Sequence, residues 1–379
     1  MKIFGIPAEI CFTRHFIFSI YICTRLSINL QLIMPLYNTV DARLLKEQLH
    51  SMDHQRVTIS FYKYHQIEDV TRFRDDLYRA WNDMGILGRT YVASEGINAQ
   101  VSVPRENFNA FRDHLFSIDF LTNIRLNLAV DDDGKSFFKL KITIRNKIVA
   151  DGINDPAFDV TQSGSHVDAL AFNQLADSPD TLIVDMRNHY ESEVGHFRNA
   201  ICPDVDTFRE ELQAVEDLMK GNEDKNLLLY CTGGIRCEKA SAWMKYKGFK
   251  NVFQLDGGII NYTRQVKEHG LENKFIGKNF VFDERLGERI TPDIISVCHQ
   301  CGKPCDDHTN CKNDACHLLF IQCAECREKY HACCSSACSE IISLPEDEQK
   351  ELRKGKAQGR MVFKKSRSEK ILFRKSDPS

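Results

Sequence analysis

Ten of the fifteen cysteines lie between Cys298 and Cys338, and this clustering constrains the fold more than any other feature of the chain. Cysteines at such short spacings favour thiolates and metal binding in a reducing compartment over a disulfide framework. Two Cys-x2-Cys pairs, Cys298/Cys301 and Cys323/Cys326, are separated by 21 residues. Two such pairs at a similar spacing hold one tetrahedral zinc ion in zinc ribbons. We therefore predict a structural zinc site formed by these four residues.

The other thiols of this segment leave the ligand pairing open. Ten thiols are enough for two four-ligand sites with two left over. The further candidate ligands are Cys305, Cys311, Cys316, Cys333, Cys334 and Cys338. Histidines that could replace some of them are His299, His308, His317 and His331. Disulfides and an iron–sulfur cluster are the alternatives to zinc.

The length of 379 residues exceeds that of a typical domain of about 150 residues, so we expect two or three compact units. The composition, 42% hydrophobic and 27% charged, excludes wholesale disorder and a fibrous class. The net charge of −3 indicates no partner by itself, but residues 350–375 carry eleven Lys or Arg against two acidic residues. This basic tail, 346–379, suits contacts with RNA phosphates; a solvated terminus is the alternative.

An apolar run over residues 16–23 lies near the N-terminus. It is too short for a bilayer, which needs about 20 residues, although it has the length of a signal-peptide core. Because no small-residue cleavage site follows it, we expect residues 1–33 to be an extension outside the fold, with Met34 as the real beginning of the protein. We expect no membrane segment and a cytoplasmic location.

Alternating apolar residues and helical spacings predict a ferredoxin-like βαββαβ domain over residues 34–150. Its expected elements are a strand at 56–64, a helix at 67–84, strands at 88–93 and 97–103, a helix at 105–116 and a strand at 124–130. Between the middle strands, 94–98 is expected to form a hairpin turn, with a ligand contact as the alternative. A further strand pair is predicted at 137–144 and 146–149.

A second domain is expected from 167 to 270, after a turn-rich boundary at 151–156. Residues 181–185 and 226–230 are short apolar runs typical of buried parallel strands, and helical segments alternate with them. We therefore predict a parallel α/β domain, followed by the cysteine-rich segment at 271–345.

The segment after the strand at 226–230 carries the candidate catalytic residue, Cys231. A loop formed by Thr232, Gly233, Gly234, Ile235 and Arg236 follows it and leads into a helix that ends before Gly248. The two glycines allow backbone N–H groups to point inward and cradle an anion. The helix N-terminus and Arg236 favour the thiolate of Cys231 over the thiol. The loop is shorter than a tyrosine-phosphatase loop and suits sulfur better than phosphate.

The residues close to the loop have expected roles of their own. Cys237 either resolves a persulfide or disulfide at Cys231 or packs its helix against the sheet, and we favour packing. Glu238 and Lys239 are expected to be solvated in the first helical turn. Asp185 and Arg187 are expected at a strand end close to the loop, where they would support it.

Residues 167–270 resemble a rhodanese domain, through Ile183–Arg187, Gly195–Ala200, the Cys231 loop and Leu255–Ile259. The resemblance extends further, because residues 34–370 are similar to the bacterial tRNA uridine(34) hydroxylase family. The blocks that carry it are Phe61–Tyr64, Glu95–Gln100, Asp185–Tyr190, Cys231–Met244, Gly277–Arg285 and the cysteine array. That family has one more cysteine where this chain has Ser339, which argues against an indispensable ligand there.

The resemblance implies oxygen-dependent 5-hydroxylation of the wobble uridine of tRNA, with Cys231 as the essential residue and O2 as co-substrate. It implies tRNA as partner, bound by the basic tail or by the sheet of the N-terminal domain. No flavin, nucleotide or two-His-one-carboxylate iron motif is visible, and no motif identifies the donor of electrons or of sulfur. The rivals are a rhodanese-type sulfurtransferase with a persulfide on Cys231 and a non-catalytic RNA-binding adaptor.

Overall fold

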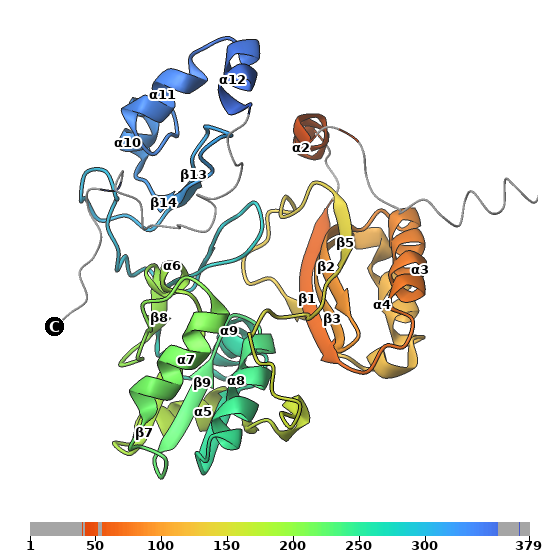
Figure 1. The fold of residues 1–379 in the computed structure, drawn as a ribbon, viewed down its shortest axis with the longest axis vertical. Coiled ribbons are helices and arrows are strands. Elements are labelled where there is room, and N and C mark those ends of the chain that lie inside the picture. The colour runs from red at the N-terminus through yellow and green to blue at the C-terminus, as the bar shows by residue number, and fades with distance from the viewer. Residues whose placement is uncertain (1–39, 41, 52–54, 355–370, 372–379) are drawn as a thin grey trace, which may run out of the picture.

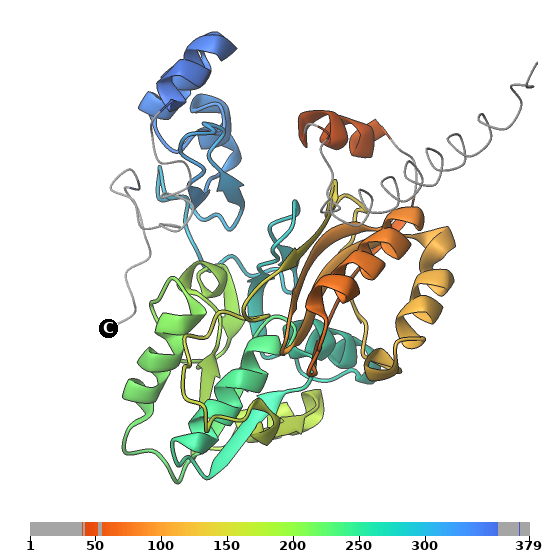
Figure 2. The same ribbon diagram turned by 45° about the vertical axis from the view of Figure 1, so that its right-hand side comes forward.

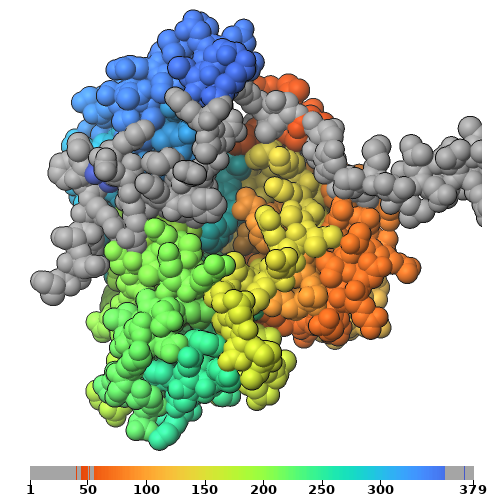
Figure 3. All heavy atoms as spheres, in the orientation of Figure 1, coloured from red at the N-terminus to blue at the C-terminus, as the bar shows by residue number. Residues whose placement is uncertain are grey.

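The structure, a computed structural model, describes residues 40, 42–51, 55–354 and 371. The expected extension at 1–33 and most of the basic tail lie outside these residues. The described chain forms an N-terminal domain, a central α/β domain and a C-terminal segment (Figures 1 and 2). In Figure 3, the yellow chain around residue 150 runs along the boundary between the first two domains. Within the described ranges, every helix is too short or too polar to cross a membrane.

The N-terminal domain is built on a five-stranded sheet with the order β4-β1-β3-β2-β5. Its strands are β1 (Arg56–Tyr64), β2 (Leu87–Ala93), β3 (Gly96–Pro104), β4 (Asn127–Leu128) and β5 (Leu140–Ile144). Its α-helices are α2 (Ala42–Ser51), α3 (Val70–Asp83) and α4 (Phe108–Phe116). The antiparallel pairing of β1 with β3 and β4, and of β2 with β3, confirms the ferredoxin-like prediction.

The two faces of this sheet differ because side chains alternate along each strand. Ile59 and Phe61 on β1 belong to the core, together with Trp81 of α3 and Phe111 of α4. Helices α3 and α4 cover this apolar face (Figure 1). The opposite face carries polar and aromatic side chains that line a cavity against the central domain. The sheet therefore presents a polar surface to the rest of the molecule.

The prediction of a strand at 146–149 is wrong. Only β5 forms in that region, and it pairs in parallel with β2. The backbone after β5 is bound by side chains instead: the N–H of Ile148 donates to Glu95 Oε1 at 2.7 Å, and its carbonyl accepts from Asn98 Nδ2 at 3.3 Å. The strand predicted at 124–130 is also shorter, since β4 spans two residues.

The central domain holds the predicted parallel sheet, with the order β6-β10-β9-β7. Its strands are β6 (Ser165–Val167), β7 (Thr181–Asp185), β9 (Asn226–Tyr230) and β10 (Asn251–Leu255). Its helices are α5 (Ala169–Ala176), α6 (His189–Ser192), α7 (Phe208–Met219), α8 (Ile235–Tyr246) and α9 (Gly258–His269). A second sheet joins β8 (Gly195–Phe197), β11 (Phe275–Asn279) and β12 (Glu288–Arg289).

The C-terminal segment has little regular structure. A two-stranded sheet pairs β13 (His308–Asn310) with β14 (Leu319–Ile321). Three short helices follow, namely α10 (Ala324–Lys329), α11 (Ser336–Ile342) and α12 (Glu346–Arg353). The cysteines lie in the loops around this sheet and at the starts of the helices.

Candidate active site

The Cys231 loop connects the carboxyl end of β9 to the N-terminus of α8, as the sequence predicts. Gly234 has a φ of +100°, which allows the chain to turn so that its N–H donates to Cys231 Sγ at 3.1 Å. The start of α9 holds the other side of the loop, because the N–H of Ile259 donates to the carbonyl of Cys231 at 3.0 Å. The sulfur therefore lies at the start of α8, and the backbone of the same residue is held by the start of α9.

Electrostatics favour the thiolate of Cys231. Burial of this fully buried side chain opposes ionisation. The Cys237 thiol, the charge of Arg236 and the N–H groups of Cys237 and Gly234 outweigh that cost and lower the pKa of Cys231 from 9.0 to about 6. Cys231 is thus mostly ionised at neutral pH, as a sulfur nucleophile requires.

Cys237 both packs in the core and contacts the sulfur of Cys231. It is fully buried beneath the loop, as expected from the packing interpretation. Burial and the neighbouring Cys231 raise the pKa of Cys237 well above its usual value. It therefore stays a thiol and donates its hydrogen bond to the thiolate.

Glu191, which the sequence alone does not single out, fixes Arg236. Both oxygens of Glu191 accept hydrogen bonds from the guanidinium, at 2.7 and 2.9 Å, and the carboxylate is fully buried. Thr232 Oγ1 accepts a third bond from Arg236 at 3.4 Å. The signal available in the sequence was the capping box of α6, in which Asn188 is followed three residues later by Glu191.

Asp185 and Arg187 support the loop from behind and do not contact the sulfur. They form a buried bidentate pair, with Nε–Oδ1 and Nη2–Oδ2 distances of 2.8 and 2.7 Å. Asp185 also accepts the hydroxyl of Tyr230 at 2.8 Å, one residue before Cys231. The pair thus anchors the end of β9.

The N-terminal domain contacts the loop from the other side. The hydroxyl of Tyr64 donates to the carbonyl of Ile235 at 3.3 Å, and Asn127 Nδ2 donates to the carbonyl of Gly233 at 3.4 Å. The hydroxyl of Tyr62 donates to Glu238 Oε1 at 3.0 Å. Burial and the charges of Glu238 and Cys231 raise the pKa of Tyr62 well above 10, so it remains a donor.

The expectation that Glu238 and Lys239 are solvated is wrong. Lys239 is 1% exposed and is held by both oxygens of Glu95, each at 2.9 Å, and by Asp151. Glu238 accepts from Tyr62 and from Gln254 and lies 2.9 Å from His166 Nε2. Both residues connect α8 to other parts of the molecule. The hairpin turn at 94–98 forms as predicted, and Glu95 on it binds a lysine.

A cavity of about 340 Å³ opens between the loop and the polar face of the N-terminal sheet. On the loop side, its lining includes Cys231, Thr232, Gly233, Ile235 and Arg236. On the sheet side, it includes Ser60, Tyr62, Arg89, Tyr91, Asn98, Gln100 and Asn127. Asp283, Arg285 and Glu288 close a third side. Its volume is in the range of small-molecule sites, and its lining mixes aromatic and hydrogen-bonding groups.

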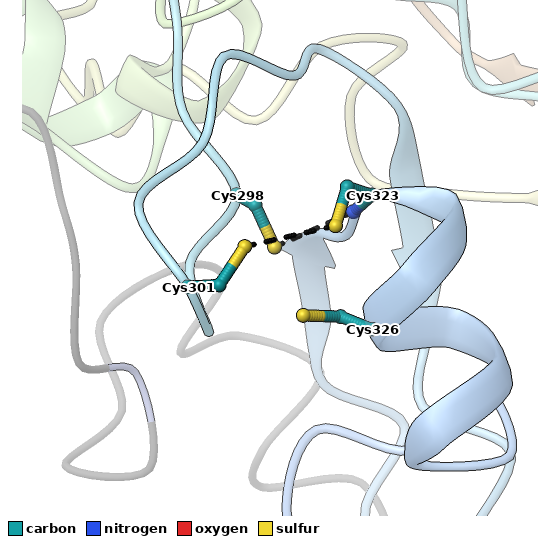
Figure 4. Close-up of side chains that lie close together, drawn as sticks. All are labelled: Cys298, Cys301, Cys323 and Cys326. Atoms are coloured by element: carbon teal, nitrogen blue, oxygen red, sulfur yellow. Dashed lines mark hydrogen bonds between the residues drawn. The ribbon is translucent and has the colours of Figure 1, made fainter.

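Eight cysteines of the C-terminal segment form two groups. Within each group, every sulfur lies within 4.8 Å of the others. The first group is the predicted one, Cys298, Cys301, Cys323 and Cys326 (Figure 4). The second is Cys311, Cys316, Cys334 and Cys338. Cys305, Cys333 and the four candidate histidines belong to neither group among the described residues. Both groups are candidate metal sites.

Comparisons with known protein families agree with this domain order. The UPF0176 acylphosphatase-like domain matches residues 56–148, the rhodanese-like domain matches residues 168–265, and the rhodanese C-terminal domain matches residues 276–339. Among solved structures, the rhodanese-like domain of an Anabaena sp. protein is 20% identical and covers 34% of this chain and 84% of its own, with a TM-score of 0.24.

Curated relatives match almost the whole chain. Proteins named tRNA uridine(34) hydroxylase are 55% identical in Enterobacter sp. (strain 638) and 54% identical in Photorhabdus laumondii and Escherichia fergusonii. Each alignment spans 336 residues, which is 88% of this chain and 96% of the relative. The chain therefore belongs to the tRNA uridine(34) hydroxylase family.

Proposed function

We propose that this protein hydroxylates C5 of the wobble uridine of tRNA, with an oxygen atom from O2 and Cys231 as nucleophile. One observation carries the proposal: the ionised sulfur of Cys231 faces a cavity whose other wall is a polar, aromatic sheet surface. Family membership supplies the substrate class. A cytoplasmic location is part of the proposal.

The reaction follows from the chemistry of a thiolate and an electron-poor ring. The thiolate adds to C6 of the uracil, which moves an electron pair towards C5. The C5 enolate combines with O2 and a proton to give a C5 hydroperoxide. An external reductant, such as a pair of thiols that become a disulfide, supplies two electrons and two protons. These cleave the O–O bond, leave a hydroxyl on C5 and release water. Loss of the C5 proton then expels the Cys231 thiolate and restores the ring double bond.

The cavity walls offer partners for the uracil. A uracil edge presents two carbonyl acceptors and one N–H donor. Arg89, Gln100 and Asn127 reach the cavity with donor groups, and the Oδ1 atom of Asn127 accepts no hydrogen bond from the described residues. Tyr91 offers an aromatic face for stacking. Arg236 keeps the sulfur ionised and is fixed by its carboxylate partner.

The test is mass spectrometry of nucleosides from tRNA incubated with the protein, a thiol reductant and 18O2. We expect 5-hydroxyuridine carrying one 18O atom, and no product with Cys231→Ser. Cys202→Ser is the matched control, because Cys202 lies outside the cavity lining, and it should keep full activity. With tRNA containing 5-fluorouridine, the C6 adduct has no C5 proton to lose and should persist as a covalent protein–RNA complex.

Three outcomes would contradict the proposal. Hydroxylation that survives in Cys231→Ser would exclude Cys231 as the nucleophile. Absence of any new nucleoside, combined with Cys231-dependent transfer of sulfur from thiosulfate to cyanide, would assign the protein as a sulfurtransferase. Tight tRNA binding without product would favour an adaptor.

A further inference from the structure

The sulfur atoms of each cysteine group are spaced as the ligands of one metal ion. The Sγ–Sγ distance is 3.7 Å for Cys301–Cys323, for Cys316–Cys334 and for Cys334–Cys338. Four sulfurs at about 2.3 Å around a tetrahedral zinc ion are about 3.8 Å apart. A disulfide would need about 2.05 Å, and all of these cysteines are free. In a [4Fe–4S] cluster each cysteine binds a different iron atom, and in a [2Fe–2S] cluster two cysteines bind each iron. Sulfurs on different irons lie further apart than the 4.8 Å within which all four sulfurs of each group lie.

The two groups alternate along the chain. The first pair of the first group, Cys298 and Cys301, precedes the first pair of the second group, and Cys323 and Cys326 come next, before the last pair of the second group. Strand β13 lies between the first two pairs along the chain, since Cys311 follows it directly. Strand β14 lies between the second and third pairs, since Cys323 comes shortly after it. Each site therefore joins two stretches of chain, and between these stretches lies one pair of cysteines that belongs to the other site.

Backbone N–H groups point at the sulfurs of both groups, as they do around thiolates that bind metal. The N–H of Cys323 donates to Cys298 Sγ at 3.4 Å, and the N–H groups of Gln300 and Cys301 point at the same sulfur (Figure 4 shows the first of these bonds). Gly302, with a φ of +74°, allows the tight turn after Cys301. In the second group, the N–H of Leu318 donates to Cys316.

The segment needs such centres because its apolar core is small. The cluster around the second group contains five cysteines but only two other buried residues, Leu318 and Phe320. A two-stranded sheet with so little apolar burial is marginal in water. Two tetrahedral metal centres would supply the missing cross-links, since binding of a structural zinc ion contributes directly to folding.

We propose that this protein binds two structural zinc ions in an interleaved arrangement, one at Cys298, Cys301, Cys323 and Cys326 and one at Cys311, Cys316, Cys334 and Cys338. Four thiolates in a tetrahedron favour zinc among the common divalent metals. Cys305 and Cys333 are buried but bind neither ion.

The first test measures the metal content of the full-length wild-type protein. Native mass spectrometry and elemental analysis should give two zinc ions per chain. X-ray absorption at the zinc edge should give four sulfur neighbours at about 2.3 Å. One zinc per chain, iron in place of zinc, or nitrogen ligands would overturn the proposal, and none of these readouts depends on tRNA hydroxylation.

The second test determines the pairing with double variants. Cys301→Ser with Cys323→Ser removes two ligands of one site and should leave one zinc ion. Cys301→Ser with Cys316→Ser removes one ligand from each site and should leave none. The alternative is a sequential arrangement, in which the first four of these eight cysteines form one site and the last four form the other. In that case the two results would be reversed.

Single variants provide the controls. Cys305→Ser and Cys333→Ser should keep two zinc ions, because neither sulfur belongs to a group.

If a double variant is insoluble, zinc release from the wild-type protein under stepwise mercurial titration still tests the proposal. We expect eight sulfurs to react with loss of both ions; release of all zinc after only four have reacted would contradict it.

Discussion

At the scale of single residues, the site depends on one buried charge pair beside one buried thiolate. Cys231 and its loop were predictable because a strand, two glycines, an arginine and a helix are contiguous in the sequence. Glu191 was not singled out, because it approaches Arg236 only after α6 has folded beside the loop. The misjudged Lys239 shows the same limit: its partner Glu95 is 144 residues away in the sequence.

The pH dependence of Cys231 tests this electrostatic account. Its pKa is lowered to about 6, so alkylation by iodoacetamide should accelerate as pH rises through 6 and level off above 7. Arg236→Gln should move the midpoint upward by about one to three units, because it removes an opposite charge. Mass spectrometry of the Cys231 peptide measures the rate at each pH.

Arg236→Lys is the matched control for this measurement. It keeps the positive charge, so the midpoint should stay closer to that of the wild-type protein than in Arg236→Gln. An unchanged midpoint in a folded Arg236→Gln protein, checked by circular dichroism, would show that the hydrogen bonds alone stabilise the thiolate.

At the scale of elements, the strands and helices of the first two domains follow the sequence patterns closely. The hydrophobic patterns predicted β1, β7 and β9 at the residues where the structure has these strands. The end of α8 before Gly248 was also predicted correctly. The error at 146–149 has a physical cause: side chains of Glu95 and Asn98 bind that backbone, so no strand partner is needed. Local patterns carry no information on such bonds.

Packing of α9 against the loop gives a prediction at this scale. A Cβ atom on Gly258 would lie 2.5 Å from the carbonyl oxygen of Cys231 and 2.7 Å from the nitrogen of Gly233. Gly258→Ala must therefore shift the loop, and we expect lower thermal stability together with at least a tenfold loss of hydroxylation, on the order of 1.4 kcal/mol in the barrier. Thermal unfolding and the nucleoside assay measure the two effects.

Gly248 offers the control, because it also has a positive φ, +96°, but a Cβ atom added there would meet no other atom within 4 Å. Gly248→Ala should cost about 1–2 kcal/mol of backbone strain and leave turnover unchanged. Equal activity of the two variants would show that the position of the loop is not set by α9.

At the scale of the whole molecule, the cavity exists because two domains are held together. Arg125 of the N-terminal domain pairs with Asp256 of the central domain, and Lys239 of α8 pairs with Glu95. The sequence predicted both domains but not their contact, since the residues that form it are far apart in the chain. The sequence also predicted the first group of four cysteines, whereas the membership of the second group required the fold.

Loss of the buried lysine should separate the domains. Lys239→Met leaves Glu95 without its cation and leaves Asp151 with Lys147 as its remaining partner. We expect a cost of about 3 kcal/mol, the lower end of the range for removing one partner of a buried pair. We expect faster proteolysis of the connecting segment at 152–164 and an unfolding transition that splits in urea. Lys250→Met, which removes an exposed pair with Asp224, should leave the unfolding transition almost unchanged, because solvent screens such a pair. Identical proteolysis of both variants would contradict this role.

The depth of Cys231 has a consequence for the RNA. Its side chain has no exposed surface outside the cavity, and both walls of that cavity are folded protein. A base stacked between its neighbours in an anticodon loop cannot bring C6 to such a sulfur, so the nucleotide must be flipped out of the stack before the chemistry begins. Unstacking costs a few kcal/mol and depends on the adjacent bases. Anticodons whose neighbouring bases stack weakly should therefore be modified faster, even where the protein reads none of those bases directly.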